Sequence, residues 1–74
     1  MSNLTDLKPG ETARILSIDA EESLHHRLTA LGFRQGKAFE LVRKASFNGP
    51  LHVRVGTTDI ILRLSEARRI QIQQ

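Results

Sequence analysis

The 74-residue sequence contains no cysteine, tryptophan or tyrosine, and only two prolines and five glycines. The absence of cysteine excludes a disulfide scaffold, thiolate metal sites and cysteine nucleophiles, and it fits a reducing compartment. No stretch approaches the roughly 18 consecutive apolar residues that a membrane helix needs. The first ten residues lack the positive start and apolar run of a secretory signal. We therefore expect a soluble, cytoplasmic protein without direct membrane insertion.

Aromatic residues are also scarce, since Phe33, Phe39 and Phe47 are the only three. Small barrels that bind single-stranded nucleic acid stack the bases on aromatic side chains in a basic groove. The net charge of +3 is uneven: residues 1–40 carry five basic and six acidic side chains, and residues 41–74 carry six and two. These basic residues are scattered and stacking residues are missing. Nucleic-acid binding is thus an alternative that we do not expect.

Patterns for catalysis and metal binding are missing too. No serine lies in a GxSxG motif, and a domain this small has little room for a deep catalytic pocket. His25 and His26 are adjacent on a predicted helix and point about 100° apart, so they cannot chelate one ion together. Glu22 could join either histidine in a weak, exposed site. The sequence predicts no catalytic residues, no cofactor and no dedicated metal site, and a small iron carrier remains an alternative.

The sequence does contain a well-marked helix after a first strand at residues 13–18. Its apolar stripe recurs at i, i+4 and i+7 and consists of Leu24, Leu28 and Leu31. Asp19 suits the N-cap position, and Glu22 three residues later completes what resembles a capping box. The predicted helix therefore has about three turns and begins close to Asp19.

Two glycines follow this helix, and both a phosphate loop and a helix end use glycines. Phosphate loops place them before a helix, where amide groups at the positive end of the dipole face the anion. Here Gly32 comes after the last leucine and fits the C′ position, where a left-handed backbone is needed. Phe33 would then pack back on Leu28. We conclude that Gly32 ends the helix and that Gly36 permits the turn into the next strand.

A β-hairpin is the most secure local prediction. Apolar and polar residues alternate over 51–55 and again over 58–64, and Gly56 and Thr57 between them suit a two-residue turn. This register pairs Val53 with Ile60. It likewise pairs Leu51 with Leu62 on the same face. Together with strands at 37–47 and 70–73 and one helical turn at 65–66, the pattern predicts a single domain over residues 1–74, a small antiparallel barrel of about five strands.

The chain as a whole resembles the FeoA family, ferrous iron transport protein A. The resemblance covers residues 4–72. It rests on an opening L..L..G pattern, the helix ending in LGF, the glycine that opens the next strand, the segment GPLHVRV and the segment ILRLSEARRI. The order and spacing of these pieces carry the match, because each alone is common.

The resemblance implies a mainly β fold, an SH3-like five-stranded β-barrel with one α-helix inserted after the first strand. It implies a cytoplasmic accessory protein of bacterial ferrous iron uptake, whose partner is FeoB, a membrane permease with a cytoplasmic GTP-binding part. The family has no defined catalytic site. An exposed barrel edge could also permit a weak homo-oligomer.

Exposed apolar residues with basic neighbours would form the surface that docks on FeoB. Leu24 and Leu28 are assigned to the core. The predicted partner-binding residues lie at the helix end and in the loop before the hairpin: Leu31, Phe33, Arg34, Phe47 and Asn48.

Overall fold

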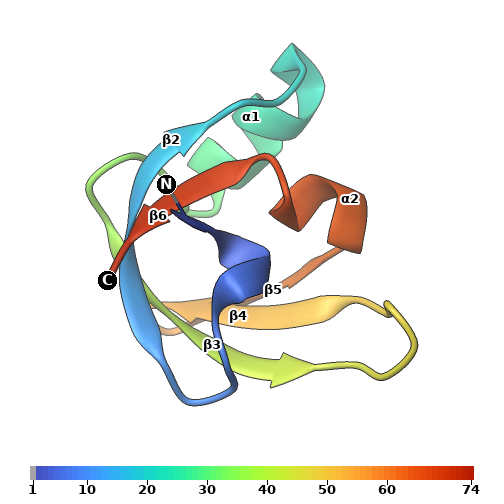
Figure 1. Ribbon diagram of the computed structural model, residues 1–74. Helices are drawn as coiled ribbons and strands as arrows, with labels where there is room; N and C mark the ends of the chain where they lie inside the picture. Colours follow the sequence, from blue (N-terminus) through green and yellow to red (C-terminus); the bar gives the residue numbers. More distant parts are fainter. Residues whose placement is uncertain (1) are drawn as a thin grey trace.

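The computed structural model describes residues 2–74, which form a strongly curved antiparallel sheet with helical segments at its ends (Figure 1). The strands are β1 (Ser2–Asn3), β2 (Thr12–Ile18), β3 (Ala38–Lys44), β4 (Leu51–Val55), β5 (Thr58–Leu62) and β6 (Ile70–Gln73). The helical elements are the 3-10 turn η1 (Leu4–Asp6) and the helices α1 (Glu22–Ala30) and α2 (Leu64–Ala67). The strand order is β1-β6-β2-β3-β4-β5, so within the described residues β1 and β5 are the sheet edges.

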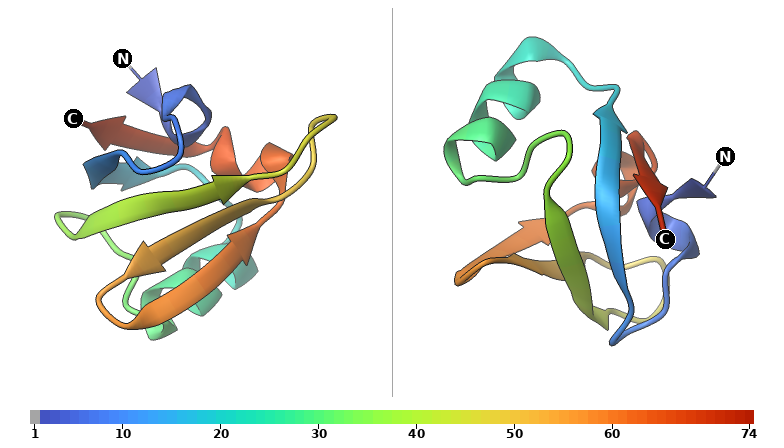
Figure 2. Two further views of the ribbon diagram at one scale, coloured as in Figure 1. Left: turned by 90° about the horizontal axis from the view of Figure 1, so that it is seen from below. Right: turned by 90° about the vertical axis from the view of Figure 1, so that its left-hand side faces the viewer.

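The mainly β fold with one longer helix after the first long strand is confirmed. All five predicted strands are present, and the predicted helical turn near residue 65 is α2. The sixth strand, β1, is an addition to the prediction. It has only two residues, and its antiparallel pairing with β6 brings the two ends of the chain side by side (Figure 2). A two-residue strand leaves no alternation for a sequence pattern to detect.

The hairpin of β4 and β5 has the predicted register. Val53 lies opposite Ile60, and Leu51 lies opposite Leu62. Gly56 adopts a φ of 61°, which a residue at the first turn position of this kind of hairpin needs. Pairing, turn chemistry and the apolar face agree here, which is why the sequence predicts this element so well.

A β-bulge interrupts β2 and explains its imperfect alternation. Ile15 lies opposite Ile72 and Ser17 lies opposite Gln71, so Leu16 is an extra residue in the ladder. The bulge turns Leu16 toward solvent, where it is partly exposed. The sequence interpretation, in which both faces of this strand were partly covered, is therefore wrong.

Helix α1 begins two residues later than predicted. Its N-cap is Glu21, which makes no side-chain capping bond. Asp19 instead donates its backbone N–H to the carbonyl of Arg69 at 2.8 Å. Because that bond keeps Asp19 in the extended segment that leaves the sheet, Asp19 is not the N-cap and the predicted capping box with Glu22 does not form.

The end of α1 matches the prediction. Gly32 has a φ of 88° and donates its N–H to the carbonyl of Thr29 at 3.0 Å. The N–H of Phe33 reaches back to the carbonyl of Leu28 at 2.9 Å. These two bonds are those of a Schellman motif, with glycine at C′. Gly32 is thus a helix stop, as its position after the leucine stripe indicates.

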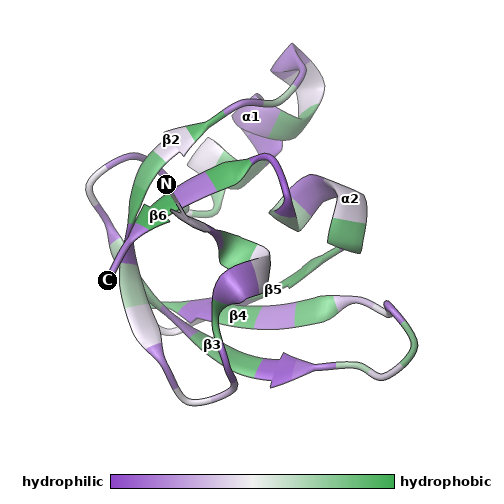
Figure 3. Ribbon diagram, viewed as in Figure 1, coloured by the Kyte–Doolittle hydropathy of each residue, from purple (hydrophilic) through white to green (hydrophobic). Residues whose placement is uncertain are grey.

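The core fills the concave side of the curved sheet, and Figure 3 shows apolar residues alternating with polar ones along its strands. Its ring pair of Phe33 and Phe39 has centroids 5.3 Å apart in an edge-to-face arrangement. Leu24 and Leu28 of α1 are buried beside it, as predicted. The core residues are Leu4, Leu7, Ala13, Ile15, Leu24, Leu28, Phe33, Phe39, Leu41, Leu51, Val53, Val55, Ile60, Leu62, Ala67, Ile70 and Ile72.

A lysine of β3 holds the N-terminal segment against the sheet. Nζ of Lys44 donates to the carbonyl of Thr5 at 2.6 Å and to that of Leu7 at 3.1 Å. This fixes the chain at η1, where Leu4 and Leu7 enter the core. No helix within residues 2–74 has the length and apolar content for a membrane crossing.

Candidate protein-docking surface

The predicted partner-binding residues fall into two groups that the structure keeps apart. Leu31 and Arg34 follow α1, near the turn that ends β4, while Phe47 and Asn48 lie in the loop that leads into β4 at Leu51. Both views of Figure 2 place that loop, drawn in yellow, well away from α1. The two groups therefore do not form one continuous patch.

The loop between β3 and β4 is held by its own backbone. The N–H of Ala45 donates to the carbonyl of Pro50 at 3.0 Å, and the N–H of Gly49 donates to the carbonyl of Ser46 at 3.2 Å. These bonds close a short turn at the end of the β3–β4 hairpin, which we call loop 45–50. The loop thus has a fixed shape that its internal hydrogen bonds maintain.

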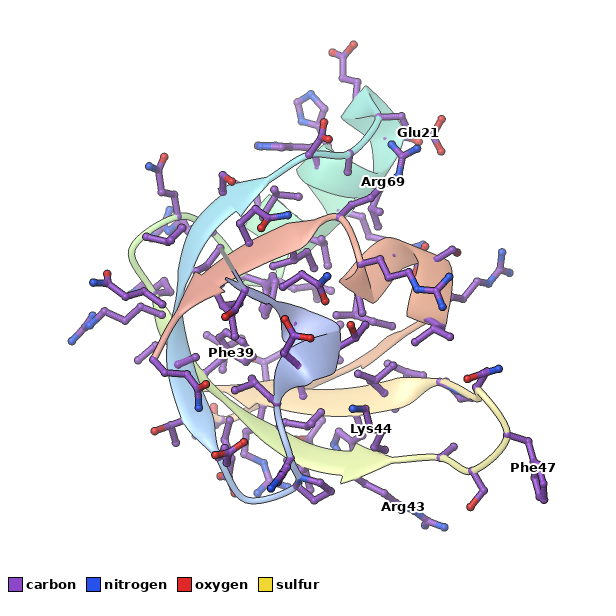
Figure 4. All side chains as sticks on the ribbon, in the orientation of Figure 1. Glu21, Phe39, Arg43, Lys44, Phe47 and Arg69 are labelled. Carbon is purple, nitrogen blue, oxygen red and sulfur yellow. The ribbon has the colours of Figure 1, made fainter. Side chains whose placement is uncertain are left out.

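Phe47 is the most exposed large apolar side chain within residues 2–74 and lies at the tip of loop 45–50. Its relative exposure is 101%, and Figure 4 shows the ring pointing away from the body of the protein. Phe47 and Asn48 have φ values of 57° and 60°. A left-handed backbone is unusual for phenylalanine and costs on the order of 1 kcal/mol, a strain that folded proteins tend to keep at functional sites.

The second group lies where α1 ends. Leu31 is the C-cap residue and is 41% exposed, and Arg34 is exposed three residues on. Phe33 lies between them in the sequence but has 0% exposure. The expectation that Phe33 is exposed to a partner is therefore wrong. The Schellman backbone turns its ring inward against Phe39, as the packing argument in the sequence had indicated.

Sequence reasoning did not single out Ile61, an isoleucine on the outer face of β5 that is 61% exposed. It lines one hollow with residues of α1, among them Leu24 and Arg27. It lines a second hollow on the other side with His52 and Pro50. The alternating pattern of β5 held a signal for this residue, because Ile61 is the one apolar side chain at an outward position of that strand.

The outer face of the β4–β5 hairpin carries a small charged cluster. Nε of Arg54 donates to Oδ1 of Asp59 at 2.7 Å, and Nε2 of His52 lies 3.1 Å from the same oxygen. The Arg54 hydrogen bond, with a smaller contribution from His52, lowers the pKa of Asp59, and Asp59 in turn raises the pKa of Arg54. Nε2 of His52 is buried and has no other polar partner within residues 2–74.

The exposed histidines of α1 form one contact with a carboxylate. Nε2 of His26 lies 3.4 Å from Oε1 of Glu22, and both side chains are largely exposed. No group of three or more histidine, aspartate or glutamate side chains suited to a metal ion occurs within residues 2–74. The geometry of the described surface suits protein docking, through a fixed aromatic ring and separate basic and apolar residues.

Comparisons with known proteins identify the family of this domain. Residues 2–74 match the family model of the FeoA domain. A Campylobacter jejuni protein with the name Fe(2+) transport protein A is 32% identical to this chain over 69 residues, which make up 93% of each chain.

Two solved structures share the fold over nearly the whole chain. A FeoA protein of Chlorobium tepidum is 29% identical with a TM-score of 0.92, over 97% of this chain and 69% of that one. FeoA of Stenotrophomonas maltophilia, described as a prokaryotic SH3 domain protein in complex with zinc, is 32% identical with a TM-score of 0.83, over 99% and 91% of the two chains. The predicted SH3-like fold is thus confirmed, and the chain belongs to the FeoA family.

Proposed function

We propose that this chain is a cytoplasmic accessory protein of ferrous iron uptake that acts by binding the cytoplasmic part of the FeoB permease. Family membership supports the role in iron transport, and the Stenotrophomonas relative is described as a candidate ferrous iron transport activating factor. The observation that carries the binding mode is Phe47, a fully exposed ring at the tip of a loop with fixed shape.

A ring presented in this way is suited to anchor a protein interface. Burial of a phenylalanine side chain by a partner gains about 1.5–3 kcal/mol, and the fixed loop reduces the entropy lost on ordering. A few such anchors usually carry most of the binding energy of an interface. Core packing does not compensate for the backbone strain at Phe47, because its ring contacts only solvent.

Basic residues accompany the anchor and would guide encounter with an acidic surface. Arg43 and Lys44 end β3 directly before loop 45–50, and Figure 4 shows the Arg43 side chain extending outward. Lys44 is occupied with the carbonyls of Thr5 and Leu7, whereas the Arg43 side chain has no hydrogen bond or ion pair within residues 2–74 and is available to a partner. We place Phe47, Asn48 and Arg43 at the centre of the FeoB contact and omit the buried Phe33.

The proposal is tested by titrating the purified cytoplasmic part of FeoB with this chain and with Phe47→Ala. We expect the substitution to weaken binding at least tenfold, which corresponds to about 1.4 kcal/mol. Leu16→Ala is the matched control, since it removes a partly exposed apolar side chain from the bulge in β2. Unchanged affinity of a folded Phe47→Ala protein would reject loop 45–50 as the anchor, and an absence of any binding would reject the function.

A further inference from the structure

In the described part of the chain, strand β5 is a sheet edge whose outward backbone groups have no partner. It pairs only with β4, and the two-residue turn makes Val55 and Thr58 the first hydrogen-bonded pair. Alternation then places Asp59 and Ile61 in non-hydrogen-bonded positions, so their N–H and C=O groups point away from β4. No backbone hydrogen bond to either residue occurs within residues 2–74 outside the hairpin.

Helix α1 runs beside this free edge without pairing to it. One hollow lies between the start of α1 and the end of β5, and another lies between the end of α1 and the start of β5; the left view of Figure 2 shows the two elements alongside each other. We call the two hollows and the edge between them the β5 groove. Its lining includes Glu21, Leu24, Arg27, Ile61, Arg63 and Glu66 at one end and Leu31, Arg34, Lys37 and Thr58 at the other.

The β5 groove carries an excess of positive charge. Four basic side chains line its two hollows against two acidic ones, and a third carboxylate, that of Asp59 on the edge between them, is paired with Arg54. Glu66 is already occupied, because its carboxylate lies 3.2 Å from Arg27 and also accepts the backbone N–H of Arg63 at 2.9 Å. The Arg63, Arg34 and Lys37 side chains have no carboxylate partner within residues 2–74. An acidic chain would therefore find unpaired cations along both ends of the groove.

We propose that the β5 groove binds an extended acidic segment of a partner protein, which adds to the sheet as a strand antiparallel to β5. Its backbone would bond to Asp59 and Ile61, its apolar side chains would cover Ile61 and Leu31, and its carboxylates would meet Arg63 and Arg34. Strand addition of this kind gives affinity through the main chain and specificity through alternate side chains. The proposal rests on the proposed function only for the identity of that partner.

A second copy of this chain fits the β5 groove less well. If two β5 edges paired about a two-fold axis, the unpaired Arg63 and Arg34 of one copy would approach the same two arginines of the other copy. Like charges facing each other across strands are destabilising. The charge of the groove thus favours a foreign acidic strand over self-association.

The test is an NMR titration of the isotope-labelled chain with a capped peptide of alternating valine and glutamate, and with its valine–lysine counterpart. We expect the acidic peptide to shift the resonances of residues 58–63 and of α1, to slow amide exchange at Asp59 and Ile61, and to bind more weakly as salt rises. The valine–lysine peptide should leave these resonances unchanged.

Two substitutions of one residue separate backbone pairing from side-chain contact. Ile61→Pro removes the outward N–H, which proline can replace on an edge strand, while Ile61→Ala removes the side chain and keeps the N–H. We expect Ile61→Pro to bind the acidic peptide about tenfold more weakly than Ile61→Ala. Should Ile61→Pro not fold, amide exchange in the unchanged chain decides the matter.

Several results would overturn the inference. One is equal binding of the acidic peptide by the two Ile61 variants, and another is a lack of protection at the amides of Asp59 and Ile61. Equal binding of the acidic and basic peptides would also overturn it. So would shifts of the β5 resonances that depend on protein concentration alone, because they would assign the edge to a second copy. The same titration with the cytoplasmic part of FeoB distinguishes the two proposals. FeoB binding that depends on Phe47 but leaves the β5 amides unprotected would support the proposed function and reject strand addition at β5. Binding of the acidic peptide without any FeoB binding would support strand addition and reject the proposed function.

Discussion

At the scale of single residues, two phenylalanines of the same chain have opposite roles. Phe33 is fully buried against Phe39, and Phe47 is fully exposed on loop 45–50. The sequence analysis named both as partner-binding residues, although its own argument for the helix end packed Phe33 back on Leu28. The Schellman turn decides it for Phe33, because its amide must reach back to Leu28.

Truncation of these two rings should therefore have very different effects on stability. Phe33→Ala leaves a cavity in the core and should lower the free energy of unfolding by about 3–5 kcal/mol. Phe47→Ala removes a ring that only solvent contacts and should change it by less than about 0.5 kcal/mol. Urea unfolding of the two variants measures both values. Similar losses in the two variants would contradict the assigned environments.

Asp59 gives a prediction for pH. Its pKa is lowered in the folded state, chiefly by the Arg54 hydrogen bond, so the folded protein holds this proton less tightly than the unfolded chain. The stabilisation from Asp59 is complete above its unfolded pKa of about 4 and is lost as the pH falls through the lower folded value. The difference in unfolding free energy between the unchanged chain and Asp59→Asn should therefore shrink on acidification. Urea unfolding at neutral pH and in acid measures it, and a difference that stays constant or grows would refute the contact.

At the scale of elements, loop 45–50 depends on a glycine for steric reasons. A Cβ on Gly49 would lie 2.8 Å from Cβ of Ala45 and 3.1 Å from the carbonyl oxygen of Ser46. Gly49→Ala must therefore open the turn that orients Phe47. We expect it to weaken FeoB binding while the core remains folded, which titration and amide exchange would show. Full affinity with Gly49→Ala would mean that the fixed shape of the loop is unimportant.

The elements also show how far the sequence alone can go. The β4–β5 hairpin was predicted with its register because apolar alternation and turn residues agree. The bulge at Leu16 and the start of α1 were missed, because both depend on long-range contacts. The bulge arises from the pairing of β2 with β6, and the start of α1 depends on the bond from Asp19 to Arg69. Asp19 satisfies every local rule for an N-cap, but a bond to a residue 50 positions away overrides them.

At the scale of the whole molecule, the barrel separates its candidate contact sites. Loop 45–50 lies at one end of β4, and the residues that follow α1 lie near the other. The sequence could suggest exposed apolar residues in both places, but only the fold shows that they lie at opposite ends of β4 and form two separate patches. A shallow groove with the inserted helix as one wall is an expectation of the SH3-like fold, but its place along β5 could not be predicted, because it depends on where α1 runs relative to a sheet edge.

The central claim is that this chain docks on FeoB through loop 45–50. The most direct test is an NMR titration of the labelled chain with the purified cytoplasmic part of FeoB, in which the affected backbone amides are mapped. We predict saturable changes centred on Ser46, Phe47 and Asn48, with buried residues such as Val53 unaffected. The absence of any change, or changes confined to the opposite end of β4, would contradict the account.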